Sequence, residues 1–195
     1  MKERIVRIFD EHARLQREFL KHNTEVLAQI ADVLLQAFRR GRTVYFFGNG
    51  GSAADAQHLA AEFVNRFRLE RRALPALALT VDTSVLTSIA NDYGYDRVFA
   101  RQLEALGRAE DVAVGISTSG ASPNVIEGIR LARRQGLVTI GFSGGDGGAL
   151  LRETDHCLVV PSNTAARVQE VHIIAGHVVC DLVEQDLVHP THETR

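Results

Sequence analysis

The sequence is short of cysteine and of positive charge, and each shortage excludes a class of protein. Only two cysteines, Cys157 and Cys180, occur in 195 residues, and both lie in apolar stretches. Two cysteines cannot build the disulfide framework of a small secreted domain, so we expect buried free thiols and a reducing cytoplasm. The formal net charge is −2. No basic surplus is therefore available to neutralise a nucleic-acid backbone, and we expect no nucleic-acid partner.

The long apolar runs of secreted and membrane proteins are also missing. Residues 1–19 are charged throughout and contain no apolar stretch of the kind that forms a signal peptide. No run approaches the roughly 20 apolar residues of a membrane-spanning helix. We therefore expect a cytoplasmic protein that has no membrane partner.

Hydrophobic periodicity indicates a long first helix and then strands and helices in alternation. Helical spacing of apolar residues extends over residues 4–39 and stops at Gly41. The later helices are expected at 52–67, 85–90, 96–106, 123–135 and 165–187. The expected strands are 43–47, 76–79, 111–116, 137–142 and 156–160.

These expected strands are apolar on both faces and are separated by helices, which is typical of a parallel sheet covered on both sides. The pattern predicts the α/β class, with a doubly wound, three-layer domain over residues 1–195 and a parallel five-stranded sheet. The helical segment 1–40 has more apolar surface than one sheet face usually covers. We therefore expect this segment to pack on other subunits as well.

A cluster of hydroxyls follows the third expected strand. In a doubly wound sheet, ligands bind beyond the carboxyl ends of the strands. Around Gly120, directly before a helix, lie four hydroxyl side chains: Ser117, Thr118, Ser119 and Ser122. Hydroxyls and free backbone N–H groups at a helix start bind anions, assisted by the helix dipole. A turn with an ordinary cap at Ser122 is the alternative, but it does not need four hydroxyls, so we favour phosphate binding.

Two glycine-rich loops follow other strands. In GNGGSAAD, after the first strand, Gly50, Gly51 and Ser52 open a helix at the same sheet edge. This loop fits neither the G-x-G-x-x-G dinucleotide pattern nor a Walker loop, because the lysine is missing. It can be a simple tight turn, but beside the hydroxyl cluster it suggests one sugar phosphate lying across the edge. SGGDGG, at 143–148, is interpreted as a flexible crossover loop with no assigned chemistry.

Acid–base side chains occur on two helices. His58 and Glu62 are four residues apart, so both project from one helix face, where they can chelate a metal ion, relay a proton or form a surface hydrogen bond. His172 and His177 lie in an apolar helix, where a histidine is usually a core residue. Gln169 and His177 are eight residues apart, ~12 Å along a helix, which is too far for both to reach one ion. Either the helix starts after Gln169 or the two come from different subunits, and we favour a shared intersubunit site.

Four motifs carry a family resemblance: GNGGSAADAQHLAAE, TSIANDYGYDRVFARQ, GISTSGASPNVI and ARVQEVHIIAGH. With them, nearly the whole chain resembles the SIS (sugar isomerase) domain family, and within it the branch that isomerises sedoheptulose 7-phosphate. The resemblance implies a flavodoxin-like fold and a homotetramer with active sites between subunits. It also implies an aldose–ketose isomerase that forms D-glycero-D-manno-heptose 7-phosphate, for the nucleotide-activated heptose of cell-envelope lipopolysaccharide.

The resemblance further implies roles for individual residues. The positions that match zinc ligands, for one ion per subunit, are His58, Glu62, Gln169 and His177. Glu62 and His177 also match the proton-transfer pair of the family. The implied substrate contacts are Asn49, Gly50, Gly51, Ser52, Glu62, Asn91, Asp92, Ser117, Thr118, Ser119, Ser122 and Gln169. Ala121 departs from the family pattern, in which an asparagine is common at that position.

A rival interpretation comes from the same family. Some SIS proteins of similar length are non-catalytic binding proteins, including a partner of the bacterial replication initiator, and they resemble this chain even in SAADAQH and ANDY. They generally lack the counterparts of Glu62 and His177, both of which are present here. Exchange through an enediol needs a base for the C–H and a route for protons between the oxygens. We assign the base to Glu62 and the acid to His177.

Overall fold

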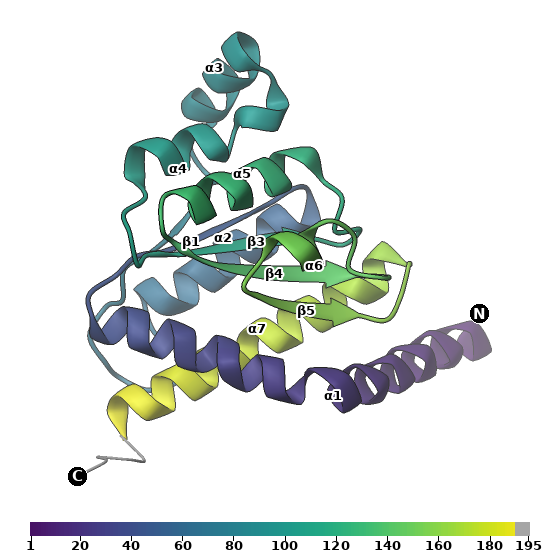
Figure 1. Cartoon of the computed structure of the whole chain (residues 1–195). Helices are drawn as coiled ribbons and strands as arrows, with labels where there is room; N and C mark the ends of the chain where they lie inside the picture. The colour runs from purple at the N-terminus through teal and green to yellow at the C-terminus, as the bar shows by residue number, and fades with distance from the viewer. Residues whose placement is uncertain (190–195) are drawn as a thin grey trace.

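The computed structural model describes residues 1–189, and within that range it forms one five-stranded sheet (Figure 1). The strands are β1 (Val44–Gly48), β2 (Ala76–Ala78), β3 (Val112–Ser117), β4 (Val138–Gly144) and β5 (His156–Val160). All neighbouring strands pair in parallel, in the order β2-β1-β3-β4-β5. The predicted parallel α/β sheet is confirmed. The part of the expected 1–195 domain beyond residue 189 lies outside the described residues.

The helices of the described range cover both faces of this sheet. They are α1 (Lys2–Arg39), α2 (Gly51–Val64), α3 (Thr83–Tyr93), α4 (Ala100–Leu106), α5 (Pro123–Arg134), α6 (Leu150–Glu153) and α7 (Ala165–Val188), with a 3₁₀ turn η1 (Tyr95–Arg97). Successive strand residues point to opposite faces. Phe46 packs in a core formed with α1, α2 and α7, whereas Phe47 packs in a second core with α4 and α5. The predicted three-layer, doubly wound arrangement is confirmed.

Several of the expected helix boundaries differ from those in the structure. Helix α2 ends at Val64 rather than near 67. Helix α3 begins at Thr83, because the Asp82 side chain accepts a hydrogen bond from the Val85 N–H and caps it. The helix expected at 96–106 is interrupted, with the 3₁₀ turn preceding α4. The crossover after β4 contains a short helix, α6, that the glycine-rich pattern of the loop concealed.

Helix α1 is longer than the body of the protein needs. Its 38 residues correspond to ~57 Å, and its C-terminal half is buried against the sheet and α7. Asn23 of this half exchanges hydrogen bonds with the backbone of Val159 and thereby satisfies part of the edge strand β5. The N-terminal turns project from the body and expose Ile5, Val6 and Phe9 (Figure 1). The expectation that this segment packs on other subunits stays a prediction.

Two further expectations concern cysteines and membranes. Cys157 and Cys180 are both unpaired thiols, Cys180 buried and Cys157 partly buried. Burial raises the pKa of Cys157 to about 11 and also raises the pKa of Cys180, so both are protonated thiols at neutral pH. No helix in the described part of the chain combines the length and the apolar character that crossing a bilayer requires.

Candidate active site

The hydroxyl cluster lies where the sequence predicts it, between the carboxyl end of β3 and the start of α5. The hydroxyls of Ser117 and Ser122 are 2.9 Å apart, and the Ser119 hydroxyl accepts a hydrogen bond from the Ala121 N–H at 3.2 Å. Ser119 is exposed, whereas Ser117 is buried. Pro123 occupies the first turn of α5, where its missing N–H leaves no bond unmade. This end of the sheet therefore offers hydroxyls and a helix N-terminus to an anion.

Gly120 gives this loop its shape. Its φ of +62° is a conformation that side chains disfavour, and an added Cβ would lie 2.1 Å from the carbonyl oxygen of Gly147. The Leu150 N–H donates to the Gly120 carbonyl at 3.0 Å, so the loop before α6 packs directly on the hydroxyl cluster. The SGGDGG loop therefore supports the cluster, a role that its sequence alone did not reveal.

The glycine loop after β1 lies beside this cluster. Gly50 has a φ of +56°, and α2 begins at Gly51. The side-chain amides of Asn49 and Asn124 donate to each other's oxygens, each at 2.8 Å, and thereby join the two loops. Ser52 is buried, and its N–H donates to the Asn49 carbonyl. The two loops therefore form one continuous edge, as the sequence predicts.

The remaining predicted substrate contacts, Asn91 and Asp92, lie on α3. Asn91 and Asp92 are exposed on the last turns of α3, where the Asn91 amide donates to the Asp92 carboxylate at 2.8 Å. Just beyond, the Tyr95 hydroxyl donates to the Asn49 side chain at 3.2 Å. The segment after α3 therefore reaches the glycine loop, although no contact of Asn91 or Asp92 with the loops is seen among the described residues.

Helices α2 and α7 lie side by side and run in the same direction. At their first turns, the Gln169 amide lies over Gly51, within 3 Å of the position a Cβ would take there. Farther along, Gly176 permits close packing, since a Cβ there would lie 2.5 Å from Leu59. The helix pair therefore begins at the edge that the two loops form and carries its remaining side chains away from it.

Three acid–base side chains converge two turns along this pair. The Nε2 atoms of His58 and His177 are 2.8 Å apart, and Glu62 Oε1 lies 3.3 Å from His58 Nε2. One ligand atom from each residue lies within 4.8 Å of the others. The His58 side chain is 47% exposed and that of Glu62 is 22% exposed. Two imidazole nitrogens and one carboxylate oxygen form a donor set that suits a divalent ion such as zinc.

Gln169 lies nearer the start of the helix pair than this group does. Helix α7 begins at Ala165, so the possibility that it starts after Gln169 is wrong. Gly51, which Gln169 covers, precedes His58 by seven residues, or ~10 Å along α2. The remaining possibility, that Gln169 serves a site on another subunit, stays a prediction.

His172 differs sharply from His177 on the same helix. It is only 1% exposed, and its Nε2 lies 3.0 Å from the carbonyl oxygen of Ser143 at the end of β4. Burial lowers the pKa of His172 to about 4, against which the Ser143 bond acts more weakly. His172 is therefore a neutral core residue that donates one hydrogen bond, as expected for a histidine in an apolar helix.

Comparison with known proteins places this geometry in a family. The SIS domain profile matches residues 8–144, which is more than half of the chain. The chain belongs to the SIS domain family. The matched region ends before α7, so Gln169 and His177 lie outside it.

Similar proteins show which branch of the SIS family the chain belongs to. A phosphoheptose isomerase from Roseiflexus sp. (strain RS-1) is 56% identical over 173 residues, covering 89% of this chain and 88% of that protein. The structure of phosphoheptose isomerase GmhA from Neisseria gonorrhoeae has a TM-score of 0.89 and 44% identity, covering 94% and 98% of the two chains. That of a phosphoheptose isomerase from Francisella tularensis has a TM-score of 0.90 and 34% identity, covering 94% and 97%. Within the SIS family, the chain is therefore a member of the phosphoheptose isomerase branch.

Two residues of this SIS-domain site were missed by the sequence analysis. Asn124 is buried, joins the two loops through Asn49, and follows Pro123 in the GISTSGASPNVI motif. Asp55 lies one turn before His58 on the same face of α2, and burial raises its pKa although the charge of His58 opposes this effect. The helical spacing of Asp55, His58 and Glu62 was the available signal.

Proposed function

We propose that this protein is a phosphoheptose isomerase, which converts sedoheptulose 7-phosphate into D-glycero-D-manno-heptose 7-phosphate for the synthesis of nucleotide-activated heptose. The convergence of Glu62, His58 and His177 two helical turns from a phosphate-type edge carries the proposal. A seven-carbon ketose phosphate has its carbonyl and its phosphate at opposite ends. One such molecule therefore needs an anion site and an acid–base site that are separated in this way.

The phosphate end of the substrate is assigned to the two loops. The phosphate is surrounded by the hydroxyl cluster, Ser117, Thr118, Ser119 and Ser122, and by the glycine loop, Gly50, Gly51 and Ser52. The sugar is contacted by Asn49, Asn91 and Asp92. The phosphate does not react. Its binding energy holds the distant carbonyl end in place. Glu62 and Gln169 contact the reacting end in the assembled site.

Proton transfer is assigned to Glu62 and His177. Glu62 takes the proton from C1 of the ketose while His177 donates a proton to the carbonyl oxygen on C2, which gives an enediol. His177 then takes the proton from the C1 hydroxyl, and Glu62 returns its proton to C2, which gives the aldose. Neither residue has gained or lost a proton at the end of the cycle.

The metal is assigned as zinc, one ion per subunit, held by His58, Glu62 and His177. Zinc bound there would act as a Lewis acid and polarise the substrate carbonyl. Gln169 is the fourth ligand of the proposal. Because Gln169 lies over Gly51 of its own chain, its ligand role requires a second copy of the chain. This requirement agrees with a homotetramer that has intersubunit active sites, assisted by the exposed apolar turns of α1. A cytoplasmic location stays a prediction.

The non-catalytic alternative does not account for this arrangement. A protein that only binds a sugar phosphate needs the loops but has no use for a carboxylate and an imidazole that converge two helical turns away from them. Incubation with sedoheptulose 7-phosphate separates the two functions. We expect an aldose heptose phosphate as product, loss of turnover with a chelator and recovery with added zinc.

A binding measurement complements the activity assay. We expect about one zinc ion per chain in the purified protein and much weaker zinc binding in His58→Ala. If metal-replete protein binds the sugar phosphate but forms no aldose product, the proposed isomerase activity is refuted and the non-catalytic binding function is supported.

A further inference from the structure

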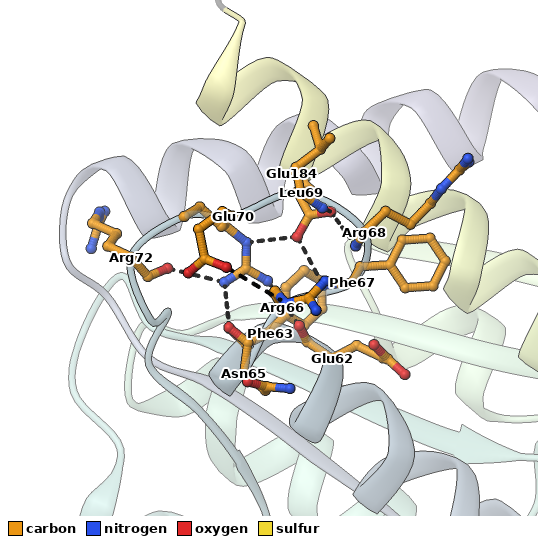
Figure 2. Close-up of polar contacts among 11 residues, drawn as sticks. Glu62, Phe63, Asn65, Arg66, Phe67, Arg68, Leu69, Glu70, Arg72 and Glu184 are labelled. Carbon is orange, nitrogen blue, oxygen red and sulfur yellow. Dashed lines mark hydrogen bonds and ion pairs between the residues drawn. The ribbon is translucent and has the colours of Figure 1, made fainter.

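A buried ion pair links α7 to the segment that follows α2 (Figure 2). Arg71 Nε lies 3.0 Å from Glu184 Oε1, and the two side chains are only 4% and 1% exposed. Burying two charges is costly unless every charged atom finds partners. The partners of this pair therefore show what the pair holds in place.

Glu184 holds the loop after α2. Its carboxylate accepts the backbone N–H groups of three consecutive residues, Phe67 at 2.8 Å, Arg68 at 2.6 Å and Leu69 at 2.7 Å. Burial opposes ionisation of this carboxyl, but the three N–H donors and Arg71 outweigh it, so the pKa of Glu184 lies below its usual value. An ionised side chain of α7 thus fixes a loop that leaves the end of α2.

Arg71 holds the end of α2 itself. The last carbonyls of a helix lack partners within the helix. Arg71 Nη2 donates to the carbonyl oxygen of Glu62 at 2.8 Å, and Nη1 donates to that of Phe63 at 2.9 Å. The guanidinium group therefore fixes the backbone of the residue that is proposed as the catalytic base.

The same loop also reaches the proposed acid. The Phe67 ring packs on the His177 ring, with their centroids 5.5 Å apart. The N–H of Phe67 is one of the three that Glu184 holds. Arg71 thus acts on Glu62 through its carbonyl, and Glu184 acts on His177 through Phe67.

We propose that Arg71 and Glu184 are positioning residues that set the geometry between Glu62 and His177, an inference that rests on the proposed function. Neither side chain is exposed enough to contact substrate. Proton transfer between aligned groups is sensitive to displacements of about 1 Å. A pair that fixes the backbone at Glu62 and the ring beside His177 therefore controls the rate of the chemical step, while the glycine loop proposed to bind the phosphate lies at the opposite end of α2.

The test is Arg71→Lys, with Glu184→Gln as a second variant. Lysine keeps a positive charge near Glu184, but its single ammonium cannot reproduce the fork that also reaches the Glu62 carbonyl. We expect kcat for sedoheptulose 7-phosphate to fall about tenfold to a hundredfold, while KM stays within about threefold of its wild-type value. Hydrogen–deuterium exchange should also become faster in residues 61–69.

Asp111→Asn is the matched control. Asp111 is also a buried carboxylate, and it accepts the N–H groups of Thr43 and Arg108, each at 2.9 Å, directly before β3. This variant should lose stability without a change in kcat per folded molecule. Equal kcat in Arg71→Lys and wild type, or a rise in KM alone, would overturn the proposal. If Glu184→Gln does not fold, the kcat and KM of Arg71→Lys alone test the proposal.

The exchange measurement separates this inference from the proposed function. If wild-type protein does not turn over sedoheptulose 7-phosphate, the proposed function fails by itself. Unchanged exchange of residues 61–69 in Arg71→Lys would show that the pair fixes neither segment, and the positioning role would fail whatever the activity.

Discussion

The two ends of the α2–α7 helix pair differ in chemistry although they belong to the same two helices. The first turns lie at the sheet edge, where Gln169 covers Gly51 and the glycine loop is joined to the hydroxyl cluster by Asn49 and Asn124. The later turns carry charged and imidazole side chains, His58, Glu62 and His177, close to the Arg71–Glu184 ion pair. The proposed function therefore divides one helix pair into a backbone end that binds an anion and a side-chain end that moves protons. The four predictions below test that division.

The largest effect is expected from Glu62→Gln. Loss of the base should lower kcat by about 10³-fold or more, because general base catalysis supplies about 10²–10⁴-fold. The affinity for sedoheptulose 7-phosphate should change little, since the phosphate edge is intact. Product formation and calorimetric binding measure the two quantities. Full activity would remove Glu62 from its role, and lost affinity would contradict the separation of the two ends.

The next largest effect is the pH dependence of stability that His172 causes. This residue lies between the two ends of α7. Its folded-state pKa of about 4 lies below the ordinary value of 6.5, so the unfolded chain takes up the proton first as the pH falls. This contribution to stability is complete above about pH 6.5 and is lost toward pH 4. It amounts to about 2.5 kcal/mol between pH 7 and 4.5.

Denaturant unfolding of wild type and His172→Gln at both pH values measures this contribution. Glutamine can still donate to Ser143 but does not titrate. The difference in unfolding free energy between the two proteins should therefore shrink or reverse at the lower pH. A pH-independent difference would show that His172 is not held neutral by burial.

A smaller effect is expected from Gly120→Ala at the anion-binding edge. A methyl group would meet the Gly147 carbonyl, and the backbone conformation is strained for alanine, so we expect a loss of about 2 kcal/mol in stability. KM should rise while kcat per folded molecule is retained. Gly136→Ala is the control, because Gly136 shares a positive φ but an added Cβ there would meet only Ala109, at an ordinary contact distance of 3.5 Å. Equal effects on KM would break the assignment of Gly120 to the phosphate site.

The smallest effect is expected from Ser119→Ala. Removal of one exposed hydroxyl from the cluster should raise KM about fivefold, the equivalent of one hydrogen bond of about 1 kcal/mol. Steady-state kinetics measure the change, with kcat expected to remain near wild type. An unchanged KM would argue that the Ser119 hydroxyl does not contact the phosphate.

The sequence predicted a large part of the fold and one end of the site. Apolar strands such as Val44–Gly48 and the glycine and serine loops that follow them are local patterns, so their class and approximate position could be read directly. The partner roles of Asn49 and Asn124 were not predicted, because those amides are 75 residues apart and meet only in the folded chain. The Arg71–Glu184 pair was missed for the same reason, since the two residues are far apart in the sequence and meet only in the folded chain. Neither residue lies in a recognisable motif.

The sequence by itself determined the parallel α/β class and the glycine- and hydroxyl-rich loops that follow its strands, because these depend on residue type and on spacing along one segment. The acid–base roles of Glu62 and His177 were predicted from the family resemblance. Only the tertiary structure decided that His58 and His177, 119 residues apart, face each other, and that the Gln169 amide lies over Gly51 of its own chain. The physical reason is the packing of α2 against α7. Helix spacing sets which side chains share a face, but close approach at positions such as Gly176 sets which faces meet.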